Sequence, residues 1–223
     1  MIYMAGNMEI FNIILLNEIK QSFKNKIFYL INFLYFVIFL SIIQILSIKI
    51  NSSNLIDITL ISVTLSLLIS ILANSNDFLR KDFVDGTLEQ LLIRYNNPEL
   101  IFVAKIFANW IQSSLVISIF STCYIYFNNI LNLNFFILLI LFLILSFGLT
   151  CLIGFSALVS IENNIALVGI IIALPLSIPL ILIFQACLKD NFQTNILTLL
   201  AMNFLTVVTT SIAGGKIIRI INQ

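Results

Sequence analysis

Long runs of apolar residues alternate with short polar segments along almost the whole chain. A helix crosses the hydrocarbon core of a bilayer, about 30 Å thick, with about 20 apolar residues. Runs of that length without an ionisable residue predict six membrane spans, at about residues 27–48, 58–76, 106–127, 135–159, 165–188 and 196–215. The first run is too long for the apolar region of a cleaved signal peptide, so we expect it to remain as a helix.

The overall composition agrees with this pattern of spans. Hydrophobic residues make up 61% of the chain and charged residues 9%, and the mean hydropathy is +1.12. A soluble domain has about 45–50% apolar and about 25% charged residues. We therefore predict an all-α, polytopic membrane protein, with residues 1–223 forming a single transmembrane domain.

Lysine and arginine residues are concentrated in alternate connections between the expected spans. One set comprises Lys20, Lys24 and Lys26 before the first span, Arg80, Lys81, Arg94 and Lys105 after the second, and Lys216 and Arg219 in the C-terminal tail. The other connections contain only Lys49 and Lys189. Because positive residues are retained on the inner side, both termini are expected in the cytoplasm, at a bacterial inner membrane, or in the matrix, at a mitochondrial inner membrane.

Several kinds of chemistry are disfavoured by the residues that the sequence lacks. No expected span contains an ionisable residue, whereas proton-coupled and sodium-coupled carriers use charges inside the membrane. The chain has no histidine, the commonest metal ligand and neutral-pH base. Cys123, Cys151 and Cys187 have no metal-ligand spacing and are interpreted as packing residues, although a disulfide between Cys123 and Cys187 stays open. We expect no metal and no catalytic residue in this chain, so an enzyme is the least supported class.

The sequence also contains no phosphate-binding loop. Gly214, Gly215 and Lys216 lack the glycine spacing of such a loop and are followed by Ile217. We interpret the glycines as the end of the last helix, with the following cations facing its dipole. If ATP is used, another chain must bind it.

Residues 8–26 predict an amphipathic helix that lies at the membrane surface. Its apolar positions Leu15, Leu16, Ile19 and Phe23 share one face, and Asn17, Lys20, Gln21 and Lys24 share the other. A simple anchor before the first span fits the same pattern.

The segment after the second span predicts a short helix in a polar setting. Asp85 and Gly86 indicate a turn, and Thr87 with Gln90 has the spacing of a capping box. Leu88, Leu91, Leu92 and Tyr95 share one helical face, while Glu89 and Arg94 lie off it. Asn97 and Pro98 are a cap and a first-turn proline for the next helix. Such a short helix needs support from the bilayer, from its own spans or from a partner.

The fifth expected span contains two prolines that interrupt its hydrogen bonds. Pro175 and Pro179 have no amide hydrogen, so we expect a bend or break there and interpret them as a hinge. Gly169, Ala173 and Ser177 recur every four residues and predict a smooth face for helix packing. Because prolines are common in membrane helices, a purely structural role stays open.

Two segments point to a family. An amphipathic N-terminal helix, six spans with both termini inside and a short helix after the second span resemble ABC-2 type permeases. More narrowly, the segments FVDGTLEQLL (Phe83–Leu92) and LPLSIPLILIF (Leu174–Phe184) resemble the cytochrome c maturation haem exporter protein B family. Length and span count agree over essentially the whole chain.

This resemblance implies a permease subunit without catalysis of its own, which docks on a cytoplasmic ABC ATPase subunit. The expected coupling residues are Asp85, Gly86, Thr87, Leu88, Glu89, Gln90, Leu91, Leu92 and Tyr95. Other implied partners are a haem-handling membrane subunit, a small single-span subunit, a periplasmic haem chaperone and membrane lipid, but no nucleic acid. ATP would be bound by the partner and haem handled by the complex, so this chain would carry no cofactor.

In that family, ATP hydrolysis is coupled to haem delivery or to release of the haem-loaded chaperone. Two alternatives remain from the sequence. A permease for another lipophilic cargo would share the fold, and a passive membrane anchor would need no ATPase.

Overall fold

The structure is a computed structural model that describes residues 7–22, 26–47, 55–131, 133–162, 166–189 and 192–221. Within these residues all regular structure is helical, which confirms the predicted all-α class. The helices are α1 (Asn7–Ser22), α2 (Lys26–Ser47), α3 (Leu55–Val84), α4 (Thr87–Tyr95), α5 (Pro98–Asn109), the π-helical turn η2 (Trp110–Ser114), α6 (Leu115–Phe127), α7 (Phe135–Glu162), α8 (Ala166–Lys189) and α9 (Phe192–Ile221).

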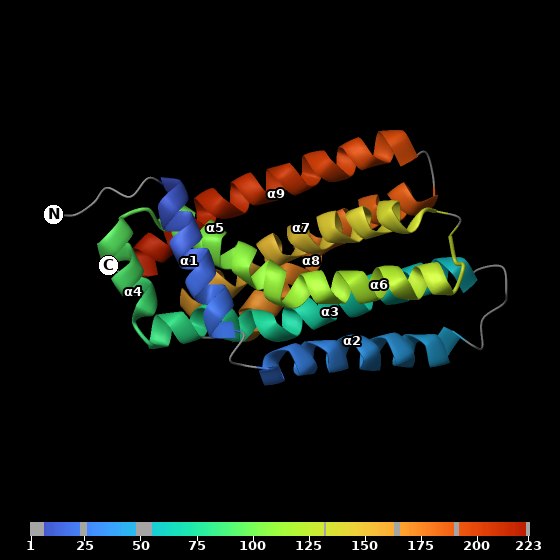
Figure 1. Cartoon of the computed structure of the whole chain (residues 1–223), viewed down its shortest axis with the longest axis horizontal. Coiled ribbons are helices and arrows are strands. Elements are labelled where there is room, and N and C mark those ends of the chain that lie inside the picture. The colour runs from blue at the N-terminus through green and yellow to red at the C-terminus, as the bar shows by residue number, and fades with distance from the viewer. Residues whose placement is uncertain are drawn as a thin grey trace.

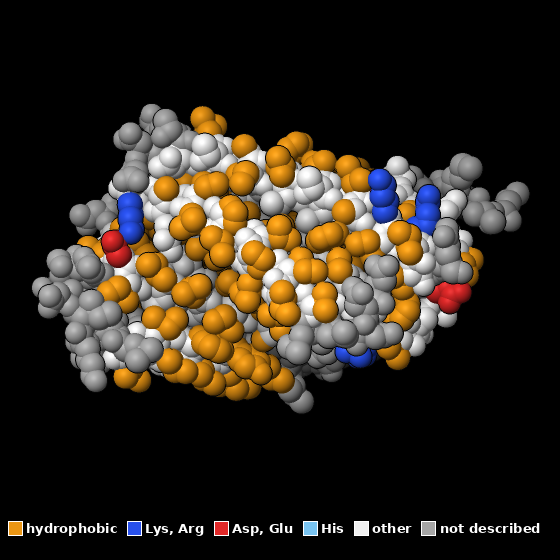
Figure 2. Space-filling model, turned by 180° about the vertical axis from the view of Figure 1, so that it is seen from behind, with side chains coloured by type: hydrophobic (Ala, Val, Ile, Leu, Met, Phe, Trp, Pro, Cys, Tyr) orange, Lys and Arg blue, Asp and Glu red, His pale blue; other side chains and the backbone are white. Residues whose placement is uncertain are grey.

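The long helices run side by side between two ends of the molecule (Figure 1). One end carries α1, α4 and the last turns of α9, and we call it the α4 end. Figure 2 shows apolar side chains covering the middle of the visible face, while the charged side chains of the described residues lie toward the two ends. This distribution matches a bilayer around the middle, because charges are costly in hydrocarbon.

Five helical segments in the described part of the chain are long and apolar enough to cross a membrane. They are Ile56–Ala73, Pro98–Phe127, Phe135–Ile161, Val168–Lys189 and Asn195–Ile221. Over the first expected span, α2 contributes the shorter apolar stretch Leu30–Ile45. The prediction of several apolar helices is therefore confirmed, while the count of six spans stays a prediction.

The third span begins earlier than the sequence predicts. Asn97 caps α5 by accepting a hydrogen bond from the Leu100 amide, and Pro98 takes the first helical position, both as predicted. From there α5, η2 and α6 continue as one helical segment to Phe127, instead of starting near residue 106. This places Lys105 inside the helix with only 1% of its side chain exposed. The expectation that the spans contain no buried charge is therefore wrong for this helix.

The two glycines near the C-terminus pack helices together instead of ending one. α9 continues past Gly214 and Gly215 to Ile221, so the predicted helix end is wrong. A Cβ atom on Gly214 would lie 2.6 Å from Cε1 of Phe102, and one on Gly215 would lie 3.0 Å from the Glu99 backbone nitrogen. Both distances are shorter than van der Waals contact, so only glycine lets α9 approach α5 this closely.

The fifth span keeps its helical form through both prolines. α8 is a single helix from Ala166 to Lys189 with Pro175 and Pro179 exposed. Of the predicted bend or break, the helix therefore does not break, while the bend and the hinge role stay predictions. Because both proline rings lie on the outer face, they do not interfere with the packing of α8 on its neighbours, and these neighbours can support the helix where its hydrogen bonds are missing.

The opposite face of α8 packs on α7. Gly169, Ala173 and Ser177 are all buried, and a Cβ on Gly169 would lie 3.0 Å from the carbonyl oxygen of Ser156 in α7. Deeper in the core, the rings of Phe142 and Phe184 meet edge to face at 4.9 Å between centroids. Cys123, Cys151 and Cys187 are all free thiols here.

Substitution of Gly214 by alanine is expected to destabilise the protein. Alanine favours helix by about 1 kcal/mol over glycine, so any loss must come from the clash with the buried ring of Phe102. We expect a net loss of about 1–3 kcal/mol, the usual cost of overpacking. Thermal unfolding in detergent measures it. Gly154→Ala, whose new Cβ would meet only the Ile106 side chain at 3.1 Å, is the matched control. Equal melting temperatures for the two variants would contradict the packing role.

Candidate functional site

The short helix α4 is set off from α3 by a tight left-handed turn. Asp85 and Gly86 form the predicted turn, and Gly86 has a φ of 70°, which favours glycine. The predicted capping box is wrong, because Gly86 occupies the cap position and no side chain caps the helix. The Thr87 hydroxyl instead turns back to α3 and donates to the Asp82 carbonyl oxygen at 3.1 Å and to Asp82 Oδ1 at 3.2 Å. A partner five residues earlier, at the end of α3, thus replaces the predicted cap within α4.

The far end of α4 is equally sharp. Asn96 has a φ of 46°, and its amide donates to the Leu92 carbonyl at 2.8 Å. Asparagine tolerates this left-handed conformation better than most residues. The next residue, Asn97, already caps α5. Two tight turns therefore fix both ends of α4 against α3 and α5.

The apolar face of α4 packs on the protein itself. Leu88 is 2% exposed and belongs to a cluster with Leu79 and Phe102. Leu91, Leu92 and Tyr95 are partly buried, and they pack against a second cluster formed by Ile10 and Ile14 of α1 with Ile101 and Ala104 of α5. Of the supports considered from the sequence, the chain's own helices hold this face. Its four apolar residues are therefore not a free surface for a partner.

The opposite face of α4 is exposed and contains one apolar residue, Ile93, that the sequence pattern missed. Glu89, Gln90 and Arg94 are exposed, and among them Ile93 is 78% exposed. Val84, two residues before Gly86, is 74% exposed. The sequence did contain a signal for this. Ile93 is apolar but lies outside the apolar stripe of α4, so packing of that stripe does not account for it.

A buried cation joins three helices beneath α4. The Nζ atom of Lys105 lies 2.5 Å from Oε1 of Glu18 in α1 and 2.6 Å from Oδ2 of Asp82 in α3. The carboxylate side chains are 22% and 15% exposed, against 1% for the lysine. A buried charge is stable only with such partners. We call Glu18, Lys105 and Asp82 the ion triad.

Helix α1 lies against α5 with a different face from the predicted one. Ile10 and Ile14 are buried, whereas Leu16 is 63% exposed. The ring of Phe11 lies 6.0 Å from that of Phe107. Leu15 and Ile19 of the predicted apolar stripe are partly buried and Leu16 is exposed. The contact with α5 thus adds a buried face that the pattern did not predict, while the orientation of the stripe toward the membrane surface stays a prediction. Phe23, Lys24 and residue 25 lie outside the described residues, as does the side chain of Gln21.

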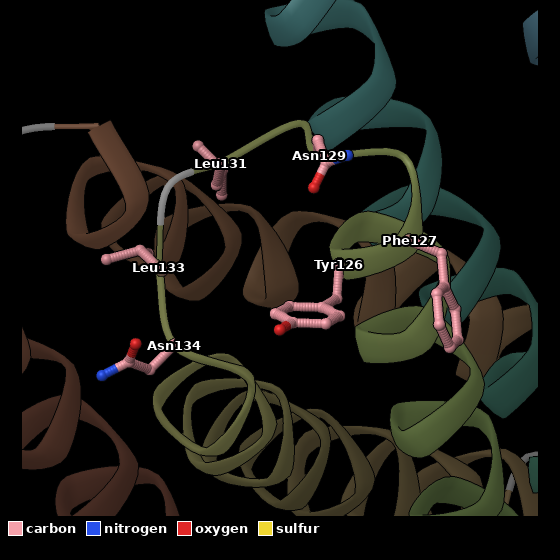
Figure 3. A pocket seen from close by; sticks show the side chains of 6 residues that line it. All are labelled: Tyr126, Phe127, Asn129, Leu131, Leu133 and Asn134. Atoms are coloured by element: carbon pink, nitrogen blue, oxygen red, sulfur yellow. The ribbon is translucent and has the colours of Figure 1, made fainter.

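A pocket of about 360 Å³ lies at the opposite end of the molecule, where α6 is connected to α7. It is lined by Tyr126, Phe127, Asn129, Leu131, Leu133 and Asn134 (Figure 3). The Tyr126 ring projects from the end of α6 toward the connecting segment. The lining is uncharged, and no cluster of metal-ligating residues occurs anywhere in the described part of the chain.

The structure brings some predicted site residues together and leaves others apart. The predicted coupling residues, which lie between Asp85 and Tyr95, form one corner with α3 and α5. The predicted hinge, Pro175 and Pro179, lies on α8, which packs on α3, α7 and α9. Sequence reasoning missed the ion triad, because its three members are far apart in the chain and Lys105 had been assigned to a loop.

The comparison with protein families gives one match. A family model described as CcmB protein matches residues 9–221, nearly the whole chain. No curated protein matches.

Replacement of Leu88 by alanine is expected to destabilise the chain. A buried leucine truncated to alanine costs about 2–5 kcal/mol. The effect is measured as the change in unfolding free energy or melting temperature of the protein in detergent. Ile93→Ala on the exposed face should change stability by no more than about 0.5 kcal/mol. Similar losses for both variants would show that the two faces of α4 are not distinct.

Proposed function

This chain belongs to the CcmB protein family, and from that premise we propose that it is the permease subunit of an ABC complex, coupling ATP hydrolysis on a partner chain to haem delivery for cytochrome c maturation. Membership makes the protein a haem-exporter membrane subunit of permease type. In the proposal, the energy drives either haem transfer or release of the haem-loaded chaperone. The chain itself has no phosphate-binding loop, so ATP binds to the partner.

The observation that carries the proposal is the division of α4 into two faces. Ile93 is 78% exposed among polar residues, while Leu88 is 2% exposed in the core. An exposed apolar residue on a helix held rigidly by its other face is suited to seat in a pocket of a cytoplasmic protein. We therefore assign docking of the ATPase to Glu89, Gln90 and Ile93. Transmission is assigned to Leu88, which is buried, and Leu92, which is partly buried.

Transmission follows from the contacts of α4. The helix packs on α3 and α5, each of which continues into the bundle. When nucleotide binding closes the ATPase subunit, the displacement of α4 passes through Leu88 and Leu92 into these two helices. A passive anchor would not need an apolar residue exposed on a fixed surface.

The complex would place this chain in a bacterial inner membrane, or a mitochondrial one, with both termini and α4 on the cytoplasmic or matrix side. The location of α1, α4 and the last turns of α9 at one end fits that arrangement (Figure 1). A haem-handling membrane subunit, a small single-span subunit and a periplasmic haem chaperone would complete the complex. Haem is cargo in this proposal, and the chain binds no cofactor of its own.

Substitution of Ile93 by aspartate should abolish docking without affecting membrane insertion. A charge in a desolvated apolar contact is strongly unfavourable, whereas in the free subunit it faces water. Co-purification of the ATPase subunit from gently solubilised membranes measures docking, and the yield of the membrane subunit measures insertion. The control Ile93→Leu keeps the apolar contact and should retain the ATPase. Full co-purification with Ile93→Asp would remove the assignment.

Replacement of both Pro175 and Pro179 by alanine tests the hinge. The substitutions restore two amide hydrogens and stiffen α8, so haem transfer to the chaperone should fall while the complex still assembles. Transfer is measured by the haem content of the chaperone, and assembly by co-purification. Unchanged haem transfer would contradict the hinge role.

A further inference from the structure

Four side chains from four helices form a continuous set of polar contacts at the α4 end. Glu18 of α1 binds Lys105 of α5 at 2.5 Å, and Lys105 binds Oδ2 of Asp82 in α3 at 2.6 Å. The other oxygen, Oδ1 of Asp82, accepts from the hydroxyl of Thr87 in α4 at 3.2 Å. Because Asp82 uses a different oxygen for each partner, both contacts exist together. The contacts therefore lead from α4 through α3 and α5 to α1.

The burial of Lys105 makes these contacts hard to separate. Its side chain is 1% exposed, so it has no access to water if a carboxylate moves away. Removing one partner of a buried charge is far more unfavourable than removing a surface pair. Apolar packing of Ile10 and Ile14 against Ile101 acts between the same two helices, α1 and α5. Together these contacts favour α1, α4, α5 and the inner end of α3 moving as one body.

The outward face of α1 carries apolar residues among polar ones, and the described part of the protein does not cover it. Met8 is 81% exposed, Ile13 41% and Leu16 63%. Lys20, near the end of the helix, is exposed as well. Exposed apolar residues with a cation, on a helix directly before the apolar helix α2, are typical of a helix at the boundary between headgroups and acyl chains. The occupant of this face is therefore the lipid surface.

We propose that Lys105 is a positioning residue that links α4 to α1, so that displacement of α4 by the ATPase carries α1 across the inner lipid surface. The inference rests on the proposed function, because it needs an ATPase acting on α4. In the proposed function, the displacement of α4 enters the bundle through α3 and α5. The further inference is that the same displacement also reaches the bilayer surface, through the ion triad and α1.

The test removes the ionic link between α1 and Lys105 and leaves the apolar packing of α1 on α5 in place. Glu18→Gln deletes the carboxylate charge but leaves Lys105 paired with Asp82. Its matched control is Glu9→Gln, the same change on the same helix at an exposed residue without an ion pair in the described part of the chain. Both variants are studied in the complete complex, reconstituted in lipid nanodiscs, with and without ATP.

The first measurement is the distance between spin labels at Asn12 in α1 and Lys81 in α3, two exposed positions. The labels are introduced after replacement of the three native cysteines by alanine. In the otherwise unchanged chain and in Glu9→Gln we expect one narrow distance distribution that ATP leaves unchanged. In Glu18→Gln the distribution should broaden and respond to ATP.

The second measurement separates hydrolysis from haem delivery. Glu18→Gln should keep the ATPase bound and hydrolysing, while haem delivery falls by at least about fivefold, the lower end of typical coupling factors between linked sites. A purely structural role would lower assembly and hydrolysis together. Lys105→Met, which removes both ion pairs, should reproduce the broadened distances in any fraction that assembles.

The outcomes distinguish this inference from the proposed function. If Glu18→Gln and Glu9→Gln give the same narrow distances and the same delivery, with the ATPase still bound, the link through Lys105 is overturned and the proposed function stands. If the unaltered chain binds no ATPase, the proposed function fails, and the inference that rests on it fails as well.

Discussion

Hydrocarbon offers no water to backbone amides and carbonyls, so a segment that crosses a bilayer must satisfy them within itself. This constraint explains why all regular structure in the described residues is helical. It also explains why many polar side chains form hydrogen bonds with the backbone of their own helix. Ser118 and Thr122, buried on α6, each donate to the carbonyl four residues earlier. The contacts between helices are then made mainly by apolar side chains and glycines, as where Gly214 lets α9 rest on Phe102. A few side chains also bond across helices, as where Trp110 Nε1 donates to Ser146 Oγ at 3.0 Å.

At the α4 end the same chain uses different contacts. There the turns at Gly86 and Asn96 take left-handed conformations, and a buried lysine pairs with two carboxylates. Strong, directional contacts of this kind resist separation more than the smooth apolar contacts between membrane helices do. The α4 end, which would meet the ATPase, is therefore a stiff unit. The membrane helices to which it is joined pack mainly through apolar contacts between complementary surfaces.

The two faces of α4 connect that stiff unit with the proposed activity. A helix of nine residues has little stability of its own and relies on its contacts. Leu88 supplies the contact with the core, and Thr87 with Asp82 supplies the contact with α3. Because the inward face is occupied, the outward face with Ile93 is presented in a fixed orientation. A subunit without its own nucleotide site must be moved by a partner enzyme. A docking residue held in a fixed orientation, such as Ile93, allows that enzyme to move the whole subunit.

The sequence by itself determined the features that depend on neighbours along the chain. Apolar runs of membrane length gave the long helices, and the local signals at Asp85, Gly86, Asn97 and Pro98 gave the turn and the helix start that the structure contains. The family was also within reach, because its motifs are short contiguous segments. Each of these follows from residue type and spacing alone.

Tertiary structure decided the features that depend on which helix lies opposite. Thr87 bonds to Asp82 instead of capping α4, since α3 brings an acceptor close to its hydroxyl. Leu16 is exposed because α5 covers Ile10 and Ile14. Lys105 is buried because Glu18 and Asp82, distant in the chain, arrive on either side of it. Such pairings are set by the folded arrangement of helices, and helical periodicity, which describes one helix at a time, contains no information about them.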